Sequence, residues 1–194
     1  MEKLYQNMLQ TIRNHPLLKK LIIYSSKYIP LITFIIYSTV LIYLFITKNN
    51  LLLSTIIKPL LSFIIVTIFR KIINRKRPYE KMNIKPLLSH KSGESFPSRH
   101  TVSAFSISLA CLKINILLGN IMLILAILVS LSRILCGVHY ISDVISAIII
   151  AFFIAFISWL SNLNIENKAN YPDKMSVICL LVFSLLCSVT VLFY

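Results

Sequence analysis

The sequence predicts an all-α protein, an integral-membrane helical bundle of about six spans with an N-terminal interfacial helix. Hydrophobic residues fill 57% of the 194 positions and charged residues only 13%, whereas roughly a quarter of a soluble domain is charged. The apolar residues are gathered into long runs, several of them close to the ~20 residues that a spanning helix needs. Because the bilayer core offers the backbone no water, these runs are expected to be helical.

Residues 1–27 are expected to form an amphipathic segment lying in the membrane interface. Lysine and arginine are interleaved there with leucine, isoleucine and tyrosine, and Pro16 either interrupts or begins the helix. No uninterrupted apolar stretch ends in a small-residue cleavage site, so a removable signal peptide is not expected. Residues 28–194 are then expected to form one bundle domain.

The spans are placed on the apolar runs between polar breaks. They are expected at residues 28–47, 51–69, 101–118, 121–131, 144–160 and 175–193. Gly119-Asn120 is the expected turn between the third and fourth spans. The longest polar stretch, residues 70–100, is separated by two spans from the polar segment 133–143. Both segments are therefore expected on the same face of the membrane.

The net charge of +14 would suggest nucleic acid in a soluble protein, but the apolar composition argues against that partner. The charges lie between apolar segments, where they can face anionic headgroups or bind phosphate. The four cysteines form no CxxC and no Cys/His cluster, so we interpret them as small buried hydrophobic residues. No metal and no cofactor is expected.

The shared face carries a surplus of guanidinium groups. Arg70, Arg77 and Arg133 are the expected ligands of a phosphate dianion, because arginine offers planar, bidentate donors. Arg99 and Lys71 are possible additions.

A helix N-terminus adds a further anion site. Pro97 suits the first helical residue of the third span, since its missing N–H is not needed there. The backbone amides of Ser98 and its neighbours would then point at the phosphate.

Two imidazoles and a carboxylate complete a phosphoryl-transfer site. His139 and Asp143 are four residues apart and would share one face of a helix, so that the carboxylate fixes the imidazole and favours its cation. His139 is the expected nucleophile. His100 could protonate the departing lipid oxygen and then deprotonate water.

These residues resemble the signatures of the type 2 phosphatidic acid phosphatase (lipid phosphate phosphatase) superfamily. The pattern Ser-Arg-x5-His-x3-Asp is present without deviation from Ser132 to Asp143, and Pro-Ser-Gly-His appears with Arg99 in the glycine place. Lys-x6-Arg-Pro appears with Arg70 in the lysine place, whereas Lys71 would need a gap of five. The resemblance implies a membrane bundle, a phosphohistidine on His139 and metal-independent catalysis.

The implied function is hydrolysis of a lipid-linked phosphate or diphosphate in the cell membrane. Polyprenyl diphosphate, phosphatidylglycerophosphate and phosphatidic acid are candidate substrates, with the polyprenyl carrier slightly favoured. Two alternatives stay open: a lipid-to-lipid phosphotransferase, and a non-enzymatic transporter or lipid-binding protein. The sequence leaves open the oligomeric state and which face of the membrane carries the site.

Overall fold

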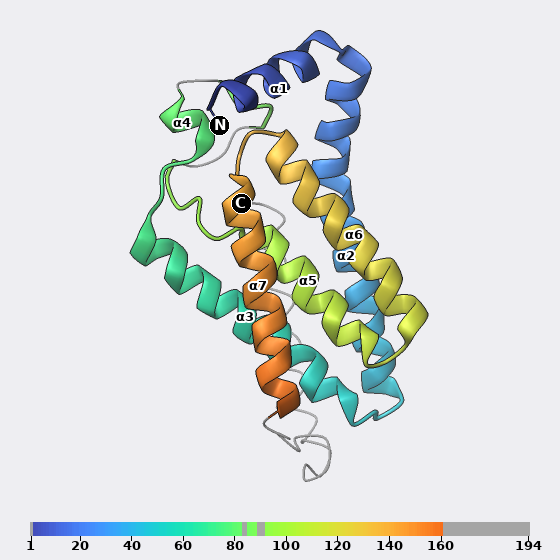
Figure 1. Ribbon diagram of the computed structural model, residues 1–194. Coiled ribbons are helices and arrows are strands. Elements are labelled where there is room, and N and C mark those ends of the chain that lie inside the picture. Colours follow the sequence, from blue (N-terminus) through green and yellow to red (C-terminus); the bar gives the residue numbers. More distant parts are fainter. Residues whose placement is uncertain (1, 83–84, 89–91, 161–194) are drawn as a thin grey trace.

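The computed structural model describes residues 2–82, 85–88 and 92–160, and this part of the chain contains helices and no strand (Figure 1). The helices are α1 (Glu2–Asn14), α2 (Pro16–Ile46), α3 (Leu51–Ile73), α4 (Pro78–Lys81), α5 (Arg99–Leu112), α6 (Ile116–Leu135) and α7 (Ile141–Leu160). The sixth expected span, residues 175–193, lies outside the described residues.

Three described ranges are long and apolar enough to cross a membrane: residues 16–46, 51–81 and 116–135. Helix α7 adds a shorter apolar stretch, Ile141–Ile157. The 14-residue helix α5 is the central element, packing against α3, α6 and α7 (Figure 1). Its position explains its length, because a helix surrounded by protein does not have to match the bilayer thickness.

The first expected span begins earlier than its apolar run suggested. Helix α2 is continuous from Pro16, its first helical residue, to Ile46, so the boundary expected at residue 27 falls inside it. Proline is well tolerated at that position because the first turn of a helix has no partner for its N–H. The expected segment 1–27 therefore contains α1 and the first part of α2.

The turn between the third and fourth spans was also misplaced. It lies at residues 113–115, where the side chain of Asn115 caps α6 by accepting the Leu118 N–H at 3.0 Å. Gly119 is helical and buried, and a Cβ atom there would lie 2.5 Å from the Leu112 backbone. This glycine permits close contact between α5 and α6 rather than a turn.

Helix α1 is amphipathic, and its apolar side packs onto the protein. Ile12 belongs to a cluster with Ile22, Cys136 and Val138, and Met8 packs against that cluster. The polar side of α1 is exposed, and the protein itself covers much of its apolar side. An interfacial position for α1 stays a prediction.

Two prolines inside the long helices leave backbone carbonyls without their usual donors. Proline lacks an N–H, so the carbonyl four residues earlier loses its helical partner. For Pro59 that carbonyl is Thr55, which accepts instead from the Tyr37 hydroxyl at 3.0 Å. For Pro30 it is Ser26, which accepts from Arg133 Nη2 at 2.6 Å.

Both replacement donors come from another helix, Tyr37 from α2 and Arg133 from α6. An unsatisfied carbonyl is costly in hydrocarbon, and membrane proteins tolerate proline where a neighbouring helix re-satisfies the freed group. Each proline therefore creates a specific contact between two helices.

Replacing Tyr37 by phenylalanine is expected to lower stability by about 1–3 kcal/mol, because a buried carbonyl loses its donor. Thermal unfolding of the detergent-solubilised protein measures the loss. In a Pro59→Ala background the same substitution should cost clearly less, since the alanine supplies its own N–H to the Thr55 carbonyl. An equal cost in both backgrounds would contradict the assignment.

Candidate active site

Three segments far apart in the sequence meet at one end of the bundle. The Ser98 N–H donates to the Asp143 carbonyl at 3.0 Å, and Arg70 Nη1 donates to the Pro97 carbonyl at 3.1 Å. Arg77 Nη1 donates to the Val138 carbonyl at 3.1 Å. These contacts confirm that the described parts of the segment 70–100 lie at the same end of the molecule as the segment 133–143.

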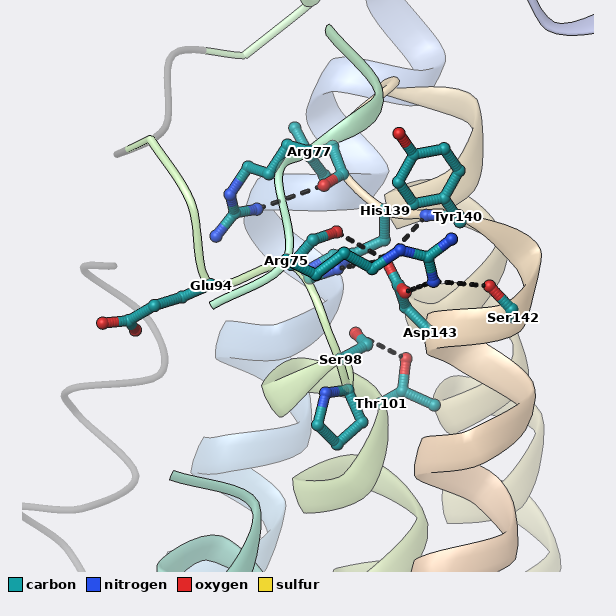
Figure 2. Close-up of polar contacts among 12 residues, drawn as sticks. Arg75, Arg77, Glu94, Ser98, Thr101, His139, Tyr140, Ser142 and Asp143 are labelled. Carbon is teal, nitrogen blue, oxygen red and sulfur yellow. Dashed lines mark hydrogen bonds and ion pairs between the residues drawn. The ribbon is translucent and has the colours of Figure 1, made fainter. Parts of the chain in front are cut away.

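The carboxylate of Asp143 lies at the centre of this region and is fully buried. Its Oδ2 accepts from the Ser95 hydroxyl at 2.5 Å and from the Tyr140 N–H at 2.9 Å. Its Oδ1 accepts from Arg75 Nη1 at 2.8 Å (Figure 2). A buried carboxylate needs such donors to offset its lost hydration, and here they also hold its position.

His139 lies in the loop just before α7, so the expected helix face shared with Asp143 is wrong, but its Nδ1 still faces Asp143 Oδ2 at 3.5 Å. That distance is an ion-pair contact but too long for a good hydrogen bond, and Nδ1 has no hydrogen-bond partner among the described residues. Catalytic hydrogen bonds often shorten only when substrate binds. A carboxylate beside Nδ1 favours the tautomer with its proton there, which leaves the lone pair of Nε2 for chemistry.

The pKa of His139 is lowered from 6.5 to about 4. Burial is the largest cause, and the positive charges of Arg77 and Arg70 act in the same direction, whereas Asp143 opposes them. The imidazole is therefore uncharged at neutral pH, the form that a nucleophile requires.

Of the two candidates for the first motif position, Arg70 lies with the other expected site residues and Lys71 does not. Arg70 is buried, contacts the Pro97 carbonyl, and has its Nη2 3.8 Å from Glu94, whereas Lys71 is exposed. Arg77 is also buried, and its Nε donates to the Gly93 carbonyl at 3.0 Å.

Ser98 occupies a different place from the one expected. It is the N-cap of α5, which begins at Arg99 rather than at Pro97. Its amide was expected to point at an anion, but it donates to the Asp143 carbonyl because α7 packs against this end of α5. The Ser98 hydroxyl accepts from Thr101 Oγ1 at 3.0 Å.

The other expected site residues are on the first turn of α5 and the last turn of α6. His100 is buried in that first turn. Arg99 beside it is half-buried, with its guanidinium carbon 5.7 Å from the centre of the Phe63 ring on α3. Arg133 is buried and bonded to Ser26, as described above.

Two side chains that contact Asp143 were not singled out from the sequence. Arg75 also bonds the Ser142 hydroxyl at 2.8 Å and lies 4.2 Å over the Tyr140 ring (Figure 2). It was present in the basic run 70–77, but spacing alone did not distinguish it from its neighbours. Ser95 carried no signal beyond its place just before the Pro-Ser-Arg-His sequence.

The family model of the PAP2 superfamily matches residues 47–167, more than half of the chain. The chain belongs to the PAP2 superfamily. The matched range contains helices α3 to α7. With its apolar helices, this membership makes the chain a multi-pass membrane protein.

Curated members of the PAP2 superfamily include two bacterial relatives. The bacitracin transport permease protein BcrC of Bacillus licheniformis is 33% identical over 58% of this chain and 57% of its own length. The undecaprenyl-diphosphatase BcrC of Bacillus subtilis (strain 168) is 37% identical over 42% of each chain. This chain thus spans about half the length of the curated relatives it matches.

A solved structure shares the PAP2 fold. The crystal structure of Aquifex aeolicus LpxE superposes with a TM-score of 0.64 at 25% identity, covering 80% of this chain and 94% of that one.

Acidification is expected to destabilise the protein through His139. Its folded-state pKa of about 4 lies below the ordinary value of 6.5. Between these two pH values the His139 imidazole binds a proton in the unfolded state but not in the folded state. Stability should fall between pH 6.5 and 4 by up to about 1.4 kcal/mol per pH unit. Thermal unfolding across that window, compared with a His139→Gln variant, checks this. Equal slopes in the two proteins would contradict it.

Proposed function

We propose that this protein hydrolyses a lipid-linked phosphate or diphosphate through a phosphohistidine on His139. The observation that carries the proposal is the buried pair of His139 and Asp143, in which Nδ1 of the imidazole faces the carboxylate at 3.5 Å. Arg70 and Arg77 are buried at the same end of the bundle. An uncharged imidazole with an orienting carboxylate is an activated nucleophile.

In the first step, Nε2 of His139 attacks phosphorus and the bond from phosphorus to the departing oxygen breaks. His100 donates a proton to that oxygen, and the imidazole bearing the phosphoryl group becomes cationic. Asp143 stabilises this cation electrostatically. In the second step, His100 takes a proton from water, the water oxygen attacks phosphorus, and the phosphorus–nitrogen bond breaks to release phosphate.

The arginines neutralise the phosphate and the charge that builds on its oxygens. Arg70, Arg77 and Arg133 each donate to a backbone carbonyl. A guanidinium has five N–H groups, so each can also donate to a phosphate oxygen. The Ser98 hydroxyl and Arg99 complete the proposed phosphate contacts. The positive charge comes from side chains, so the proposed mechanism requires no metal.

Polyprenyl diphosphate in the plasma membrane is the substrate we favour. Support comes from the relative named undecaprenyl-diphosphatase, whose match to this chain is 37% identical. The lipid tail would lie against α2, α3, α6 or α7, all of which expose large apolar side chains.

Purified protein is expected to release phosphate from undecaprenyl diphosphate, and His139→Ala should lower the rate by at least about 1000-fold, as loss of a nucleophile does. A chelator should leave the rate unchanged, and vanadate should inhibit by occupying the phosphate site. His15→Ala is the matched control, because His15 is exposed and precedes α2. Equal activity of wild type and His139→Ala would overturn the proposal.

The same assay separates the competing reactions. A hydrolase releases phosphate without an added lipid acceptor, whereas a phosphotransferase releases it only weakly and transfers it to an acceptor lipid. A transporter or lipid-binding protein shows no turnover at all. Labelled substrate should also leave an acid-labile phosphoryl group on wild type that His139→Ala lacks.

A further inference from the structure

Helix α1 lies across the end of the bundle that carries the candidate active site (Figure 1). It is close to the loop between α6 and α7, residues 136–140, which contains His139. This loop is not helical, and Gly137 adopts a φ of +80° that favours glycine. The Gly137 and Val138 N–H groups donate to carbonyls of α6, and the Tyr140 N–H donates to Asp143 on α7. The donor to the carbonyl of His139 itself comes from α1.

The hydroxyl of Tyr5 holds the backbone of that loop from α1. It lies 2.8 Å from the His139 carbonyl and 2.9 Å from the Ile134 carbonyl, so its one proton is shared between two acceptors. Ile134 is in the last turn of α6, and its carbonyl also accepts from the Gly137 N–H at 3.0 Å. Tyr5 thus connects the end of α6 to the nucleophile, from a position 134 residues away.

Two further turns of α1 reinforce this contact. Leu9 lies one turn after Tyr5, and its Cδ atoms are 3.2 and 3.3 Å from where a Cβ of Gly137 would be. Ile12 packs in the cluster that contains Cys136 and Val138. The apolar face of α1 therefore fits the shape of this loop.

Other carbonyls of the loop also have donors from distant segments. The Cys136 carbonyl accepts from the Leu87 N–H at 3.2 Å, and the Val138 carbonyl accepts from Arg77. Arg77 is also a proposed phosphate ligand, so its geometry will respond to substrate. Tyr5 holds the backbone of His139 itself and has no proposed contact with phosphate.

We propose that Tyr5 is a positioning residue for catalysis: its hydroxyl fixes the backbone of His139, and so the direction in which Nε2 meets phosphorus. This inference rests on the proposed function. A displacement of about 1 Å at a reacting group can cost about 100-fold in rate, so one hydrogen bond to this backbone matters to turnover. Binding of the phosphate depends on the arginines, which are not among the hydrogen-bond partners of Tyr5.

The test is Tyr5→Phe in the full chain, assayed for phosphate release from undecaprenyl diphosphate. The ring still packs, but the hydroxyl is gone. We expect kcat to fall about 10- to 100-fold, with KM within about twofold because the arginines are unchanged. The matched control is Tyr43→Phe, which removes the hydroxyl of an exposed tyrosine on α2 and should leave both constants unchanged. Thermal unfolding of each variant is measured in parallel.

The outcomes are distinguishable. An unchanged kcat for Tyr5→Phe would overturn the inference and leave the proposed function intact. A rate that falls only in proportion to the amount of folded protein would show a structural role and also overturn it. If wild type releases no phosphate, the proposed function fails and this inference fails with it. A selective loss of kcat in folded protein supports the inference.

Discussion

The arrangement of this end of the bundle depends on the burial of one carboxylate, that of Asp143. A buried, ionised carboxylate is tolerated only when donors surround it, and this one draws them from two separate regions. Arg75 and Ser95 come from the polar stretch 70–100, and the Tyr140 N–H comes from just before α7. The backbone carbonyl of Asp143 adds a bond from the start of α5. Satisfying one negative charge therefore brings α3, α5 and α7 together around the neighbouring imidazole.

The same requirement for satisfied polar groups governs the interior of the bundle. Tyr37 and Arg133 supply the donors that Pro59 and Pro30 cannot. Arg133 is thus both a link between α6 and α2 and a proposed phosphate ligand. Within the described part of the chain its Nε has no hydrogen-bond partner, so this donor is available for the proposed phosphate contact while the link is intact. Structure and proposed chemistry use different N–H groups of the same side chain.

The sequence predicted those features that depend on residue spacing. The four-residue interval from His139 to Asp143 was enough to place their side chains together, although His139 precedes α7 instead of sharing a helix face with Asp143. The apolar runs located the long helices of the described part. It failed where packing between helices decides the outcome. Gly119 looked like a turn because its contact with Leu112 is not visible in either run alone. Arg75 was hidden among the other cations in residues 70–77, and only the three-dimensional contact distinguishes it. Tyr5 could not be connected to His139 across 134 residues.

The two proline-linked contacts differ in how much chain separates their partners, and this bears on biogenesis. Tyr37 and Thr55 are 18 residues apart, so the bare carbonyl of α3 can find its donor as soon as that helix docks on α2 to form a hairpin. Ser26 and Arg133 are 107 residues apart. The Ser26 carbonyl can therefore gain its Arg133 donor only after α6 has been synthesised, whereas the contact between α2 and α3 needs no later part of the chain.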